Sequence, residues 1–95
     1  MDARNSKMLP QSDQIGVSFL FTELESADTF LDIADTTSMP ESADRNRRHA
    51  FKAYMTVRDL LPLVVLQEEE EADIYHKLNL IRQRLIEAGY SVELG

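Results

Sequence analysis

Three aspartates of this 95-residue chain are spaced so that their side chains could act together. Asp28, Asp32 and Asp35 are four and three residues apart, so a helix places them on one side. Carboxylates grouped in this way can bind a cation or share a proton. The same spacing is also typical of a solvated flank beside an apolar helix face, and the residues alone favour that plainer interpretation.

A second polar group is basic and consists of Arg45, Arg48 and Lys52. On a helical projection these residues lie opposite Ala50 and Tyr54, so we expect them to face water. As a functional site they would bind an acidic peptide or a phosphate. As surface residues they would form ion pairs with the acidic segment before them, each pair contributing at most about 1 kcal/mol.

The two histidines, His49 and His76, are not in an HExxH arrangement, and we expect both at the surface. The segment from Arg45 to His49 resembles, with a shorter separation, the Arg-Asn-…-His signature of helical nucleotide-binding domains with ribonuclease activity. With Asp28 and Asp32 it leaves open a small metal- or nucleotide-handling enzyme. Our main prediction is nevertheless a chain without catalytic residues, cofactor or metal ligands.

Length and composition limit the function further. A chain of 95 residues with 43% hydrophobic content fits one small globular domain. Its net charge of −7 argues against general binding to nucleic acid or to anionic membranes. The absence of cysteine excludes disulfides and zinc–thiolate sites and fits a reducing compartment, so we expect a cytoplasmic protein. The apolar run 60–66 is too short to cross a bilayer, and residues 1–14 lack an apolar signal segment.

Apolar residues recur with the period of a helix in three successive blocks. The three stripes are Leu20, Leu24, Ala27, Leu31 and Ala34; Ala50, Tyr54, Val57 and Leu61; and Ile74, Leu78, Ile81 and Leu85. Phe19 and Phe30 are expected to widen the first stripe. The pattern predicts an all-α fold, a small three-helix antiparallel bundle. We divide the chain into a flexible arm (1–14), a three-helix domain (15–89) and a tail (90–95).

Local signals predict where these helices start. The first pattern begins near Ile15, although the capping box 22–25 leaves open a start at Thr22. Ser38 is expected to cap the second helix with Pro40 in its first turn. The acidic run 68–71 suits the positive end of the third helix dipole.

Other signals predict where the helices end. Pro62 cannot donate a backbone hydrogen bond and is expected to end or kink the second helix. The apolar connector 63–66 should then fold back over the core. Gly89 is expected to close the third helix in a left-handed conformation, and the alternation of Tyr90 and Val92 leaves open a docked, extended tail.

Part of the chain resembles a known repeat family. Four residues have the spacing found in the second helix of a tetratricopeptide repeat: Ala50, Tyr54, Val57 and Pro62. Beyond them, Ala72 and Tyr75 fall on the small and aromatic positions of a following repeat's first helix. The resemblance covers Ala50 to Tyr75 and implies a tetratricopeptide-like helical hairpin, plus one further helix, that binds protein or peptide.

Several apolar residues fall outside the three stripes, which is typical of a surface that contacts a partner. With the basic group, they form the predicted partner surface: Ile33, Met55, Leu80, Arg45, Arg48 and Lys52. We therefore predict a protein–protein interaction module, adaptor or regulatory, whose partner is another protein or a second copy of the chain. The alternatives are the small enzyme described above and a structural subunit of a larger complex.

Overall fold

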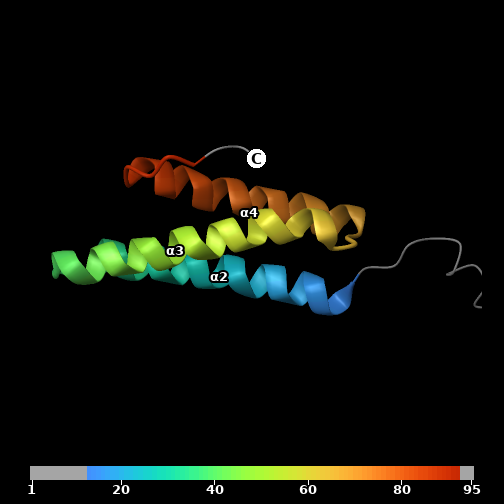
Figure 1. The fold of residues 1–95 in the computed structure, drawn as a ribbon, viewed down its shortest axis with the longest axis horizontal. Coiled ribbons are helices and arrows are strands. Elements are labelled where there is room, and N and C mark those ends of the chain that lie inside the picture. The colour runs from blue at the N-terminus through green and yellow to red at the C-terminus, as the bar shows by residue number, and fades with distance from the viewer. Residues whose placement is uncertain (1–12, 93–95) are drawn as a thin grey trace, which may run out of the picture.

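The computed structural model describes residues 13–92. Within that range the chain forms three α-helices and no strand: α2 (Gln14–Thr36), α3 (Pro40–Leu60) and α4 (Glu68–Glu87). A single 3-10 turn, η1 (Leu61–Leu63), follows α3. Consecutive helices run antiparallel, and α2 and α4 point in the same direction (Figure 1). The prediction of an all-α, three-helix bundle is confirmed.

The predicted stripes form the core. Its buried members on α2 and α3 include Leu20, Leu24 and Val57, and α4 adds Ile74 and Leu85. Each of these side chains is almost fully removed from water, so the helices are held mainly by apolar burial. No charged or polar residue is buried in the part of the chain that the structure describes.

Helix α2 begins earlier than the capping box at Thr22 would place it. Asp13 is its N-cap, and an Asp13 carboxylate oxygen accepts a 3.0 Å hydrogen bond from the backbone N–H of Gly16. The Asp13 N–H also donates to the carbonyl of Val65 at 2.9 Å, which ties the start of α2 to the α3–α4 connection. The predicted arm 1–14 lies outside the described residues, except for Asp13 and Gln14, which belong to this helix start.

The cap predicted at Ser38 is wrong by one residue. Helix α3 starts at Pro40, and Met39 is its N-cap without a capping side chain. Proline favours the first helical position, where its missing N–H costs little, and it therefore sets the cap at the residue before it. Pro62 ends α3 as predicted, because the chain turns into η1 after Leu60.

The connector after η1 covers the core only in part. Val64 and Leu66 pack against the core, whereas Leu63 and Val65 are exposed. The expectation that the whole segment folds over the core is wrong, because an extended backbone directs successive side chains to opposite sides.

Helix α4 starts and ends where the sequence indicated. Its first turn contains Glu68 to Glu71, and the backbone N–H of Gln67 donates to Glu70 at 2.8 Å in a capping box. Gly89 follows the helix with φ +97°, which confirms its predicted left-handed conformation. The turn brings the Tyr90 ring onto Phe51 of α3 at 5.1 Å between centroids, so the tail docks at least through this residue.

Candidate interaction surface

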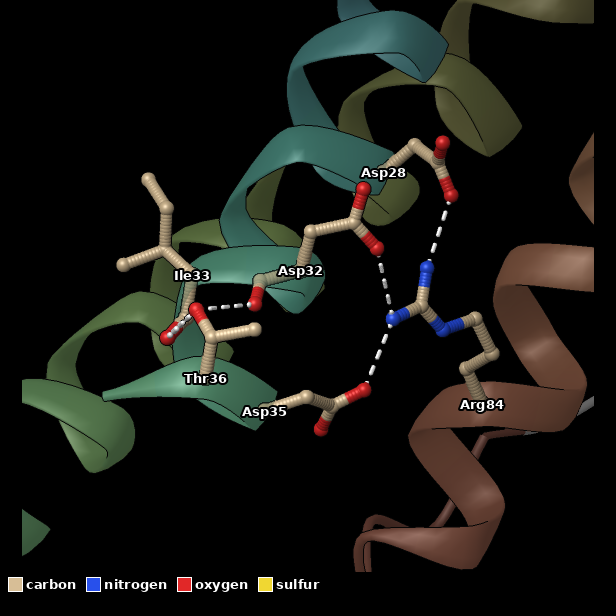
Figure 2. A network of polar contacts seen from close by, with 6 residues as sticks. All are labelled: Asp28, Asp32, Ile33, Asp35, Thr36 and Arg84. Carbon is tan, nitrogen blue, oxygen red and sulfur yellow. Dashed lines mark hydrogen bonds and ion pairs between the residues drawn. The ribbon is translucent and has the colours of Figure 1, made fainter. Parts of the chain in front are cut away.

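The three spaced aspartates meet a single arginine from α4. The guanidinium of Arg84 lies 2.8 Å from Asp28, 3.1 Å from Asp32 and 2.9 Å from Asp35 (Figure 2). The Arg84 side chain is 28% exposed, whereas the three carboxylates are mostly exposed. The planar guanidinium can donate several hydrogen bonds at once, so one residue bridges two turns of α2.

Burial by itself lowers the pKa of Arg84, but hydrogen bonds to Asp35 and Asp32 and the nearby charges of Asp32 and Asp28 raise it above its ordinary value. Arg84 is therefore a permanent cation at the α2–α4 contact. The three aspartates therefore do lie on one side of α2, as their spacing predicted, and Arg84 of the same chain is the cation that pairs with them. Among residues 13–92, no group of three or more histidine, aspartate or glutamate residues could hold a metal ion.

Sequence reasoning did not predict Arg84 as the partner of this flank. A usable signal was present: Lys77 and Arg84 are seven residues apart and border the Ile74 stripe on the same side. Lys77 itself pairs with Asp73 at 3.6 Å within α4. The Arg84 pairs could only be inferred once the neighbouring helix was known.

The three predicted basic residues of α3, Arg45, Arg48 and Lys52, form no ion pair with the acidic flank. Arg48 pairs with Asp44 of its own helix, and both side chains are more than half exposed. Arg45 and Lys52 are also exposed, and within residues 13–92 neither has a carboxylate within ion-pair distance. The three residues therefore form a solvated edge, as the helical projection predicted.

The residues of the enzyme alternative are not brought together. His49 lies beside Phe30 of α2, with ring centroids 5.1 Å apart and the rings tilted by 33°. Asp28 and Asp32 face Arg84 instead, and Arg45 is exposed. His76 is at the surface of α4, so each of the two histidines is on a different helix.

The three predicted apolar partner residues lie on three different helices. Ile33 on α2 is 41% exposed and Leu80 on α4 is 54% exposed. Met55 on α3 is half-buried and packs against the core, so part of its side chain stabilises the bundle itself. Leu80 lines a hollow between α2 and α4 whose floor is Leu24 and Ile81. The charged groups of this hollow are Glu25, Asp28 and Lys77.

A larger exposed region lies on α2, on the side away from the core. We call it the outer face and define it by eight uncharged residues: Ile15, Ser18, Phe19, Thr22, Ser26, Thr29, Phe30 and Ile33. Ser26 and Phe30 are half-buried and the other six are exposed, including Ile15 at 85% and Phe19 at 43%. Helix α2 forms one edge of the bundle, with α3 and α4 both on its other side (Figure 1). The outer face is therefore open.

The sequence interpretation assigned one of these residues, Phe19, to the wrong side. Phe19 was expected to widen the buried stripe, but it projects outward because it is 140° around the helix from Leu24. Phe30 lies at the border of the outer face, where its ring contacts His49 of α3 and packs against the core. The signal for a second apolar face was the recurrence of Ile15, Phe19 and Ile33 between serines and threonines.

Comparison of the chain with family models, with curated proteins and with solved structures finds no match. The tetratricopeptide resemblance therefore stays a prediction. Its residues Ala50, Tyr54 and Val57 are buried in the bundle, whereas Ala72 and Tyr75 are exposed. No helix within residues 13–92 has both the length and the apolar character needed to cross a membrane.

Proposed function

We propose that this chain is a small helical protein–protein interaction module and that the outer face of α2 is its main contact surface. The proposal rests on one observation: large apolar side chains on this face are exposed to water. Ile15, Phe19 and Ile33 are between 41% and 85% exposed, although burying such side chains is favourable by about 1.5–3 kcal/mol each. A partner that covers the face would recover part of this free energy.

The lack of charge on the outer face supports the same proposal. Charged residues make up 28% of the chain, whereas on this side of α2 they lie only at the borders, at Glu23 and Glu25. Depletion of charge in the centre of a contact region, with apolar and aromatic residues present, is typical of protein interfaces. The serines and threonines between them keep the face compatible with water when no partner is bound.

The hollow at Leu80 is a second contact area of the proposed module. It is smaller and bordered by the charged groups of Glu25, Asp28 and Lys77. Charges at the rim of an interface affect association rate and specificity more than affinity. We therefore assign the main affinity to the outer face and a supporting role to the hollow.

The proposal extends to the cell compartment and to the class of partner. A chain without cysteine is suited to the reducing cytoplasm. The net charge of −7 and the few basic residues at the surface favour a protein partner over a nucleic acid.

Site-specific photocrosslinking in the cells that produce the chain tests the function. A benzophenone side chain is placed at Thr22 on the outer face, at Leu80 in the hollow, or at the exposed Gln83 of α4 as a control. We expect adducts with a second protein molecule, either a different protein or another copy of the chain, mainly from Thr22, fewer from Leu80 and none from Gln83. Equal labelling at the three positions, or no adduct at Thr22 with either a different protein or a second copy of the chain, would contradict the proposal.

A further inference from the structure

The eight positions of the outer face of α2 are arranged symmetrically along the helix. Leu24 is its midpoint, and Ile15 and Ile33 are each nine residues away from it. Thr22 and Ser26 flank the midpoint at two residues on either side. Small hydroxyl residues therefore occupy the centre of the face and isoleucines occupy both ends.

At the intermediate positions, the residues on the two sides of the midpoint differ in type. Each side of the midpoint has one aromatic and one hydroxyl residue at five and six positions from Leu24: Phe19 and Ser18 on one side, Thr29 and Phe30 on the other. Across the midpoint, every aromatic position corresponds to a hydroxyl position. A face with this property can pack against an inverted copy of itself.

We propose that the outer face is a two-fold interface between two copies of this chain, with the two α2 helices antiparallel and centred at Leu24. In a two-fold interface, residue i of one copy contacts residue j of the other, and j contacts i. Inversion about Leu24 places Ile15 against Ile33 of the second copy. The inference rests on the proposed function and names the partner as the chain itself.

The centre and the ends of the pair have different roles. Thr22 meets Ser26 of the second copy, and such small side chains let two helix backbones approach closely, because interaxial distance depends on the residues at the contact. Phe19 meets Thr29 of the second copy, whose methyl group gives the ring an apolar contact. The isoleucines close the two ends of an interface about 27 Å long, given a rise of 1.5 Å per residue.

The size of the contact sets the expected affinity. One helix face against another buries less surface than the roughly 1,200–2,000 Å² of a stable complex. We therefore expect a dimer that dissociates in the micromolar range or above, at concentrations that sedimentation experiments reach easily.

Because of the charges beside the outer face, salt should affect a dimer of this chain and a complex with a basic partner in opposite ways. Glu23 and Glu25 border the outer face, and the two-fold relation brings each toward its own counterpart in the second copy. Dissolved salt screens this repulsion, so the dimer should tighten as ionic strength rises. A complex with a basic helix would weaken under the same conditions.

Sedimentation of the purified full chain tests the dimer. We expect a concentration-dependent dimer that is stronger at 0.5 M than at about 0.05 M salt, where the Debye length changes several-fold. Thr22→Glu places two new like charges beside the two-fold axis and should leave only monomer. Gln83→Glu changes the net charge equally but lies on α4, and it should not alter the dimer.

Both substitutions are at exposed positions, so circular dichroism should show the same helix content and melting for all three proteins. A monomer at millimolar concentration, or a dimer that persists in Thr22→Glu, would overturn the inference. Crosslinking of a different protein at Thr22, combined with a strict monomer in solution, would reject the dimer and leave the proposed function standing.

Disulfide trapping tests the antiparallel register independently. The chain has no cysteine, so Ser18→Cys and Thr29→Cys each introduce a single thiol at an exposed position. In the proposed dimer, residue 18 is level with residue 30 of the second copy and therefore only about 1.5 Å along the axis from residue 29 of that copy, whereas the two copies of residue 18 are about 18 Å apart along the axis. A disulfide needs Cα atoms within about 7 Å.

Mild oxidation of the mixed variants should therefore yield a heterodimer that neither variant forms with itself. Equal amounts of homodimer from Ser18→Cys alone would indicate a parallel or irregular pair and would overturn the proposed register. Thr56→Cys on α3, away from the outer face, is the control for random collision between thiols.

Discussion

The inner and outer faces of α2 both carry apolar side chains at helical spacing, but they differ in what stands between those side chains. On the inner face, leucine and alanine follow one another and bury completely against α3 and α4. On the outer face, Ile15, Phe19 and Ile33 are separated by serine and threonine and remain in contact with water. Spacing alone therefore indicates a helix, whereas the residues between the apolar ones indicate whether a face belongs to the core or to a contact surface.

The largest expected effect is the loss of folding stability caused by a substitution on the inner face. Leu24 on the inner face is 2% exposed, so Leu24→Ala creates a cavity and should lower the free energy of unfolding by about 2–5 kcal/mol. Urea unfolding followed by circular dichroism measures the loss. A loss below 1 kcal/mol would show that the inner face is not tightly packed and would remove the contrast between the faces.

The acidic side of α2 lies between these faces and should contribute less. Arg84→Gln leaves Asp28, Asp32 and Asp35 without their common cation, and we expect a loss of about 1 kcal/mol, because the carboxylates are more than half exposed to solvent. The difference from the unsubstituted chain should shrink in high salt. Arg48→Gln removes one exposed pair on α3 and should change stability hardly at all, so equal losses in the two variants would contradict the role given to Arg84.

The dependence of folding stability on alkaline pH tests the buried side of the bundle independently. Burial raises the pKa of Tyr54 above its ordinary value near 10, although Arg82 and Arg58 partly oppose the shift. A raised pKa in the folded state means that ionisation opposes folding. The stability that neutral Tyr54 contributes is complete below about pH 10 and is lost as pH rises through the folded-state pKa.

We therefore expect Tyr54→Phe to lose less stability between pH 9 and pH 11 than the unsubstituted chain, as measured by urea unfolding at each pH. Tyr75→Phe is the matched control, because Tyr75 is 47% exposed. Parallel pH profiles for the Tyr54→Phe variant and the unsubstituted chain would show that burial of this phenol has no effect on alkaline unfolding.

The smallest expected effect on the isolated chain is on the outer face. Phe19→Ala removes a side chain that is 43% exposed, and the free energy of unfolding should fall by no more than about 0.5 kcal/mol at dilute concentration. Ile33→Ala should behave in the same way. If either variant loses as much stability as Leu24→Ala, the outer face is part of the folded core and the contact-surface proposal fails.

Local rules predicted most of the fold. The steps of three and four between Leu20, Leu24 and Leu31 identified the buried side of α2, and Pro62 and Gly89 ended α3 and α4 as expected. These outcomes depend on backbone geometry within a few residues, which a sequence reports directly.

The candidate surface was harder to predict, because it depends on which helices become neighbours. Nothing local links Arg84 to Asp28, since they are 56 residues apart and meet only after α4 packs beside α2. Phe19 was assigned to the core because an aromatic residue beside a buried stripe normally widens it. Its actual side became clear only when α3 and α4 were seen to occupy the opposite half of α2.

The reversal of the chain at Gly89 has a practical consequence for handling this protein. Tyr90 returns to Phe51 on α3, and Val92, the last described residue, packs against the core, whereas Asp13 lies two residues before Ile15 of the outer face. An affinity tag or fluorescent protein fused after the last residue should leave the surface of α2 accessible. The same fusion before the first helix would stand close to that surface and could mask self-association in any assay that uses it.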